Sequence, residues 1–141
     1  MGDTHTKEQR RKNMQAIKSK SKLEDKVSSE LWRRGLRFRR NVKSLFGQPD
    51  IAIKKYKIVI FIDSCFWHDC SIHGNKPKSN SAYWEKKLQR NKERDKEVTS
   101  YYQEIGWHVL RIWEHEFKEN FTETINHIEA FIKKKKGKNE L

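Results

Sequence analysis

The stretch that decides the fold runs from Lys57 to His73 and reads K-I-V-I-F-I-D-S-C-F-W-H-D-C-S-I-H. Residues 58–62 form an apolar run that is typical of a buried strand and is too short to span a membrane. Polar side chains of three chemical kinds follow at once, namely Asp63, Cys65, His68, Asp69, Cys70 and His73. A structural turn rarely gathers carboxylates, imidazoles and thiols in this way. We therefore interpret the stretch as a metal-dependent active site beside a structural metal site.

The whole chain is strongly basic. Its 141 residues carry 32 Lys and Arg against 19 Asp and Glu, a formal net charge of +13. This charge indicates a polyanionic partner, most simply nucleic acid, with an anionic membrane surface as the alternative. Aromatic residues at 11% argue against disorder, because their side chains bury large areas. We expect no membrane association and a cytoplasmic protein, in which two cysteines are more typical of a metal site than of a disulfide.

Hydrophobic periodicity predicts the order helix, three strands, helix, strand, helix. The expected elements are a helix over 22–34, strands near 36–43, 51–53 and 57–62, a long helix over 82–105, a strand over 107–113 and a last helix beginning after Asn120 or Thr122. This order indicates the α/β class, with a mixed β-sheet flanked by helices.

Basic segments flank this predicted domain. Residues 1–20 are polar and basic, and we expect an arm that folds over phosphate groups. Residues 133–141 begin with a run of lysines, and we expect a disordered tail that adds nonspecific attraction for DNA. Residues 21–132 then form a single domain, because no repeat or linker divides them.

Two carboxylates are expected to meet at one end of the sheet. Asp50 opens the strand 51–53, and Asp63 closes the strand 57–62. If these linked strands are antiparallel, the start of one lies beside the end of the other. Converging carboxylates repel each other unless a cation lies between them, and oxygen ligands suit Mg²⁺. With the nearby His68, the pair predicts a Mg²⁺-dependent site.

A second group of side chains has the spacing of a zinc site. Cys65, Cys70 and His73 are arranged as C-x4-C-x2-H, and thiolate and imidazole ligands at such spacing suit tetrahedral Zn²⁺. Three ligands require a fourth, and His115 is the candidate if the strand before it lies next to the strand 57–62. A site closed by four protein ligands would be structural rather than catalytic.

Five blocks of the sequence resemble the very short patch repair (Vsr) DNA mismatch endonucleases. They are K-N-M-Q-A-I-K-S-K at 12–20, G-Q-P-D at 47–50, V-I-F-I-D-S-C-F-W-H at 59–68, Y-W-E-K-K-L-Q-R-N-K-E-R-D at 83–95 and G-W-H-V-L-R-I-W-E at 106–114. The resemblance covers about residues 9–117 in the same order. It implies a PD-(D/E)xK nuclease core. The expected order of helices and strands also fits that core.

The resemblance implies a Mg²⁺-dependent nick on the 5′ side of the mispaired T in a T:G mismatch, which arises when 5-methylcytosine deaminates. Carried over by position, Asp50 is the principal Mg²⁺ ligand, and Ile62 binds the metal through its backbone carbonyl. His68 is the catalytic histidine that acts on the attacking water, and Glu24 is an acidic residue that supports the site. Asp63 stands where some members have histidine, so it is either a second metal ligand or an acid/base partner of His68.

The same resemblance implies how DNA and zinc are held. Phe66, Trp67 and Trp84 match aromatic side chains that wedge into the base stack, and a mismatch makes that distortion easier. Further candidates for DNA contact are Lys18, Lys20, Asn91 and Arg94. The structural Zn²⁺ falls on Cys65, Cys70, His73 and His115, although another version of the family uses C-x4-H-x-C and a late cysteine. The lysine of the wider nuclease motif is absent, because Cys65 stands in its place.

We expect a monomer that acts on double-stranded DNA containing a T:G mismatch. Mismatch-repair proteins and a cytosine methyltransferase are candidate partners, and the bases flanking the mismatch are left open. Two alternatives remain at this point. One is a related Mg²⁺-dependent nuclease that cuts paired or branched DNA, and the other is a zinc-stabilised DNA-binding module without catalysis.

Overall fold

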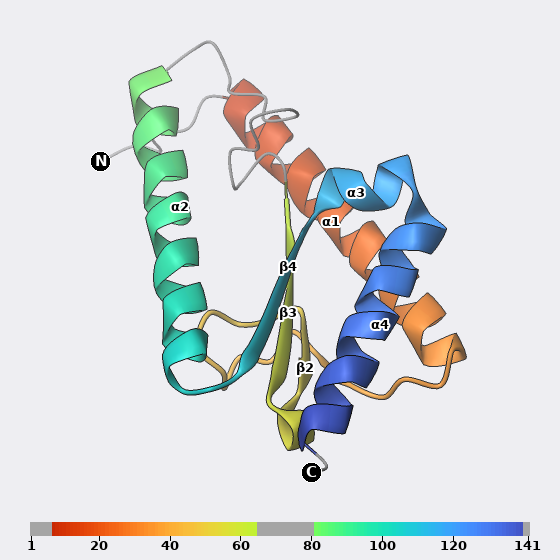
Figure 1. The fold of residues 1–141 in the computed structure, drawn as a ribbon. Helices are drawn as coiled ribbons and strands as arrows, with labels where there is room; N and C mark the ends of the chain where they lie inside the picture. The colour runs from red at the N-terminus through yellow and green to blue at the C-terminus, as the bar shows by residue number, and fades with distance from the viewer. Residues whose placement is uncertain (1–6, 65–80, 140–141) are drawn as a thin grey trace.

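The computed structural model describes residues 7–64 and 81–139 (Figure 1). The elements are α1 (Lys7–Arg33), β1 (Arg39–Arg40), β2 (Ile51–Ile53), the short helix η1 (Lys54–Tyr56), β3 (Ile58–Asp63), α2 (Ser81–Glu104), β4 (His108–Trp113), α3 (Glu114–Glu119) and α4 (Phe121–Asn139). The predicted order of helices and strands is confirmed, with η1 and α3 as short additions.

The sheet is mixed, as predicted for the α/β class. Its strands lie in the order β1-β2-β3-β4. The pairs β1–β2 and β2–β3 are antiparallel, whereas β3 and β4 are parallel, with Asp63 opposite Trp113. Because β2 is antiparallel to β3, the start of β2 lies beside the end of β3. The C-terminal ends of β3 and β4 and the N-terminal end of β2 therefore share one edge of the sheet.

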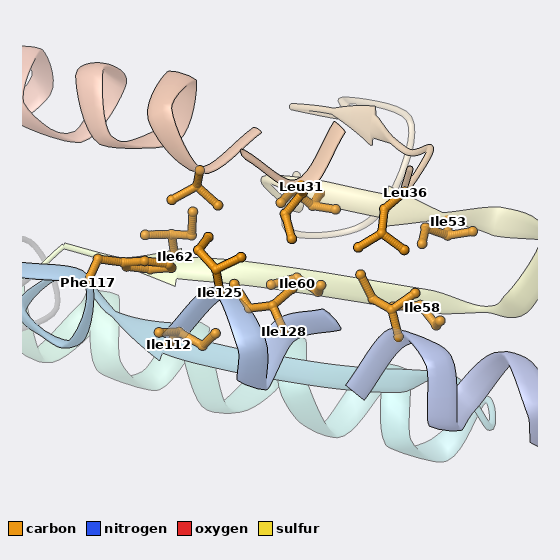
Figure 2. Close-up of a cluster of buried hydrophobic side chains, with 13 residues drawn as sticks. Leu31, Leu36, Ile53, Ile58, Ile60, Ile62, Ile112, Phe117, Ile125 and Ile128 are labelled. Atoms are coloured by element: carbon orange, nitrogen blue, oxygen red, sulfur yellow. The ribbon is translucent and has the colours of Figure 1, made fainter. Parts of the chain in front are cut away.

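Helices cover both faces of the sheet: α2 lies on one side, and α1 and α4 lie on the other (Figure 1). Side chains alternate along β3, so neighbouring residues belong to different cores. Ile58, Ile60 and Ile62 pack with side chains of α1 and α4 in the larger core (Figure 2). Val59 and Phe61 face α2. Burying each large aliphatic side chain contributes about 1.5–3 kcal/mol, which makes this two-sided burial the main source of stability.

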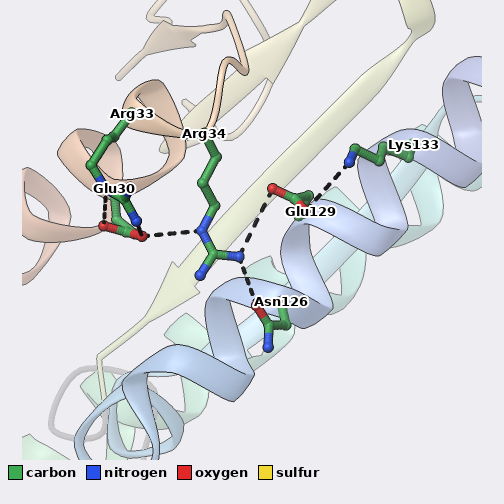
Figure 3. Close-up of polar contacts among 6 residues, drawn as sticks. All are labelled: Glu30, Arg33, Arg34, Asn126, Glu129 and Lys133. Carbon is green, nitrogen blue, oxygen red and sulfur yellow. Dashed lines mark hydrogen bonds and ion pairs between the residues drawn. The ribbon is translucent and has the colours of Figure 1, made fainter.

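A polar network joins α1 to α4 at the rim of the larger core (Figure 3). Arg34 donates from Nε to Glu30 Oε1 at 3.1 Å and from Nη1 to Asn126 Oδ1 at 2.6 Å. Its Nη1 also lies 3.8 Å from Glu129 Oε2. Hydrogen bonds from Arg33 and then from Arg34 lower the pKa of Glu30 to about 2.

The first helix is longer than predicted. We expected it over 22–34, but α1 begins at Lys7. Residues 7–21 contain neither glycine nor proline and are rich in Lys, Arg and Gln, which favour helix. The polar and basic composition was therefore interpreted as an arm, whereas the backbone of residues 7–20 is part of α1.

The prediction of a disordered tail is wrong for residues 133–139, which continue α4. No proline interrupts this segment, and its lysines have local partners. Lys133 Nζ lies 3.4 Å from Glu129 Oε1, one helical turn away. Lys136 Nζ lies 5.2 Å from the centre of the Tyr56 ring, which fixes the last turns of α4 beside η1.

The first strand is shorter than the predicted segment 36–43, because β1 spans only Arg39–Arg40. Among the described strands, β1 pairs with β2, which is three residues long, and Asn41 has a φ of 47°, outside the extended region. Arg39 and Arg40 are both exposed. Neighbouring residues of a strand point to opposite faces, so these two arginines do not form the single basic face that was predicted. Among the described helices, none is long and apolar enough to cross a membrane.

Candidate active site

A pocket of about 390 Å³ opens between the sheet and α2 at the edge where β3 ends. One wall comes from the turn before β2 and from the end of β3, including Gln48, Asp50 and Asp63. The opposite wall is one face of α2. The predicted meeting of Asp50 with Asp63 is thus confirmed, and the antiparallel pairing of β2 with β3 is its cause.

Asp50 is buried and held by the backbone of β3. The Ile62 N–H donates to Asp50 Oδ2 at 2.7 Å, and the backbone N–H of Asn41 donates to the Asp50 carbonyl at 3.1 Å. In a strand, the N–H and C=O of one residue face the same neighbour. The Ile62 carbonyl is therefore directed toward the side of β3 on which Asp50 lies. A carboxylate with a peptide carbonyl beside it is a donor set that fits a hard cation such as Mg²⁺.

Asp63 has a different environment, because it forms an ion pair with Arg111 of β4. Arg111 Nη1 lies 2.8 Å from Asp63 Oδ1. The same guanidinium donates from Nε to Thr99 Oγ1 at 2.8 Å and from Nη2 to the Asp95 carbonyl at 3.3 Å. It also lies over Phe61, with its carbon 4.3 Å from the ring centre. Arg111 thus connects β3, β4 and α2.

Sequence reasoning missed Arg111, although a signal was present. It is the only charged residue in the apolar strand 108–113 apart from the titratable His108. Two parallel neighbouring strands would place it on the same face as Asp63, because residue 111 pairs with residue 61. The ion pair between Arg111 and Asp63 follows only from the register between β3 and β4.

The α2 wall of the pocket is basic and polar. Lys87, Asn91 and Arg94 line it, one helical turn apart. Asn91 and Arg94 were predicted to contact DNA, and both lie across the pocket from Asp50. Positive side chains facing a carboxylate pair suit an anionic ligand that brings or shares a cation.

The turn that carries Asp50 is fixed against α2. The Tyr102 hydroxyl donates to the Phe46 carbonyl, and burial, with a smaller effect of Tyr101, raises the pKa of Tyr102 to about 12. Gly47 packs on Val98 so closely that a Cβ at this glycine would lie 2.6 Å from Val98 Cγ1. The φ of Gly47 is +76°, which also favours glycine.

Comparisons with known proteins agree with this geometry. The family described as DNA mismatch endonuclease Vsr matches residues 2–73. The chain is 40% identical over 138 residues to the type II nicking enzyme V.NmeDIP of Neisseria meningitidis serogroup C, covering 96% of this chain and 93% of the relative. It is 45% identical over 115 residues to the type II nicking enzyme V.HpaIIP of Haemophilus parainfluenzae, covering 79% and 82%. It is 40% identical over 116 residues to DNA mismatch endonuclease Vsr of Escherichia coli (strain K12), covering 81% and 74%.

The chain belongs to the Vsr family of DNA mismatch endonucleases. It is therefore an endonuclease, and DNA is the substrate on which the family acts. The mixed α/β architecture, with a four-stranded sheet and flanking helices, is consistent with a Vsr nuclease fold. The resemblance deduced from the sequence blocks is confirmed.

Several residues predicted for a Vsr active site lie outside the described part of the chain. They are Cys65, Phe66, Trp67, His68, Cys70 and His73. Lys18 and Lys20 belong to α1, but the structure does not describe their side chains. Glu24 is partly buried on α1 and is not among the described residues that line the pocket.

Trp84 is fully buried near the start of α2 and meets Tyr83 edge to face, with ring centres 5.3 Å apart. A side chain in this position reaches DNA only if the surrounding residues rearrange. The predicted wedging role of Trp84 stays a prediction.

The predicted zinc site is only partly visible. The expectation that the last strand lies next to β3 is confirmed, because β4 pairs with it in parallel. His115 follows β4 at the edge where β3 ends, and its ring stacks on Trp113 at 6.3 Å between centres. Within residues 7–64 and 81–139, no three His, Cys, Asp or Glu side chains are grouped to hold a metal. The Zn²⁺ set stays a prediction.

Proposed function

We propose that this Vsr-family protein hydrolyses one phosphodiester bond on the 5′ side of the mispaired T in a T:G mismatch, with Mg²⁺ as cofactor. The observation that carries the proposal is the buried Asp50, held by the Ile62 N–H in a pocket with a basic opposite wall. The printed name of the Escherichia coli relative, a DNA mismatch endonuclease, supports a mismatch as the substrate.

Asp50 and the Ile62 carbonyl would hold the Mg²⁺. When bound, Mg²⁺ supplies stabilisation of the charge that develops on the scissile phosphate. Lys87 and Arg94 on the α2 wall attract the DNA backbone toward this carboxylate, which alone would repel it. In this proposal, the imidazole of His68 accepts the proton of the attacking water.

The remaining predicted residues support binding rather than chemistry. Phe66 and Trp67 insert beside the mismatch, where a wobble pair lowers the energy needed to unstack a base step. Zn²⁺ held by Cys65, Cys70, His73 and His115 would fix the segment that carries these aromatics and His68. The protein acts as a monomer in this proposal, and repair of deaminated 5-methylcytosine is its biological setting.

The test uses an end-labelled duplex with one T:G pair, in varied flanking sequences, beside its T:A twin. We expect a nick 5′ of the mispaired T with Mg²⁺, and no nick with EDTA or in the twin. Cutting of both duplexes would instead identify a nuclease for paired DNA. Cutting that persists in EDTA would reject the Mg²⁺ site.

A further inference from the structure

We propose that Asp63 and Arg111 form a positioning ion pair that fixes α2 against the sheet, and that Asp63 does not bind the catalytic metal. This inference rests on the proposed function, because it assigns different tasks to the two carboxylates of the pocket. Asp50 takes the cation, and Asp63 takes Arg111.

The first support is the number of elements that Arg111 joins. Its guanidinium contacts Asp63 at the end of β3 and both Thr99 and Asp95 of α2, while its own backbone belongs to β4. The side chains of Asp63 and Arg111 are only 10% and 19% exposed. A planar guanidinium with several fixed donors holds such partners in one geometry, which a lysine in its place could not reproduce.

The second support is electrostatic. The charge of Asp63 is balanced at 2.8 Å by the positive guanidinium of Arg111. A divalent cation bound to the same carboxylate would lie close to that positive group and be repelled by it. The hydrogen bond that orients Asp50 comes instead from the neutral N–H of Ile62, at 2.7 Å.

The third support is what the ion pair holds in place. Asp95 and Thr99 lie one to two turns after Asn91 on α2, and Asn91 lines the pocket. On the same face of α2, Val98 packs on Gly47. Arg111 and the Gly47 turn therefore hold this face of the helix at neighbouring positions, so the width of the pocket depends on both.

The test is a double-mutant cycle with Asp63→Asn, Arg111→Met and the double variant, assayed where all three are folded. Arg111→Met leaves a buried carboxylate without its counter-charge, so we expect nicking to fall about 100-fold and the unfolding midpoint to fall clearly. Asp63→Asn keeps the shape and should cost less than about ten-fold in rate. The double variant should nick about ten-fold faster than Arg111→Met, because it removes the more deeply buried of the two carboxylates that Arg111 compensates. The carboxylate of Asp95, whose Oδ1 lies 3.7 Å from Arg111 Nη1, is the same in both variants.

Two readouts separate positioning from metal binding. The Mg²⁺ concentration for half-maximal rate in Asp63→Asn should stay within about two-fold of the wild type, and the loss should fall on kcat rather than on KM for DNA. The matched control is the exposed pair Arg40–Asp25, at 2.7 Å. Arg40→Met with Asp25→Asn should change neither the rate nor the unfolding midpoint measurably.

The inference is overturned if the double variant is as slow as Arg111→Met, or if Asp63→Asn raises the half-maximal Mg²⁺ about ten-fold. Failure of the proposed function looks different, because the wild type itself would then not nick the T:G duplex. In that case the unfolding midpoints of the cycle, which need no DNA, still decide whether Asp63 and Arg111 are coupled.

Discussion

The two faces of the sheet are built for different tasks. Among the described residues, the face under α1 and α4, here called the closed face, is covered by a cluster of thirteen buried apolar residues, and the cluster under α2 has six. The polar pocket lies on the α2 side, at the end of β3. Because side chains alternate along a strand, Ile62 points into the larger core while its neighbour Asp63 reaches Arg111. Stability and chemistry are thus separated across one strand.

The largest expected effect is on the α2 side. Asp50→Asn keeps the size of the side chain and an acceptor for the Ile62 N–H, but it removes the charge. We predict about a 10³-fold loss in single-turnover nicking of a T:G duplex, which corresponds to about 4 kcal/mol in the barrier, with little change in the unfolding midpoint. Nicking within about ten-fold of the wild type would show that the chemistry lies elsewhere.

The next effect concerns the closed face. Ile60 belongs to β3 and is fully buried against the helices α1 and α4. Ile60→Ala should lower the free energy of unfolding by about 2–5 kcal/mol in urea titrations and leave the rate per folded molecule unchanged. Ile105→Ala is the matched control, because Ile105 is 45% exposed and its truncation should be close to neutral. A rate loss in folded Ile60→Ala would mean that the two faces are not separate.

An intermediate effect is expected where α2 meets the turn that carries Asp50. Gly47→Ala adds a Cβ against Val98, so we predict a loss of about 1–3 kcal/mol in stability together with slower nicking. Gly106→Ala separates backbone strain from the clash, because its φ is +78° but a Cβ there meets nothing within 4 Å. Equal nicking by the two variants would show that the fit of Gly47 on Val98 does not position Asp50.

The smallest effect belongs to the rim of the closed face. The pKa of Glu30 is lowered to about 2 from 4.5, so its contribution is complete above about pH 4.5 and is lost as the pH falls toward 2. Wild type and Glu30→Gln should therefore differ in urea midpoint at pH 5 and converge near pH 2. Nicking at neutral pH should be the same for both. A difference that grows on acidification would have the wrong sign.

The sequence was informative where an apolar strand and a candidate site residue are next to each other in the chain. The apolar run 58–62 predicted β3, and the positions of Asp50 and Asp63 at strand ends predicted their meeting. The ion pair of Asp63 was not predictable, because it depends on the register between β3 and β4, which are distant in sequence. The length of α1 and the last turns of α4 were underestimated, since a basic helix and a disordered chain have similar composition.

Metal binding distinguishes the two carboxylates most directly. Mn²⁺ can be titrated into a mixture of protein and T:G duplex and followed by electron paramagnetic resonance, for the wild type, Asp50→Asn and Asp63→Asn. We predict that Asp50→Asn weakens Mn²⁺ binding at least about ten-fold, while Asp63→Asn stays within about two-fold of the wild type. Tight binding by Asp50→Asn, with loss of binding in Asp63→Asn, would contradict the assignment of the catalytic cation to Asp50.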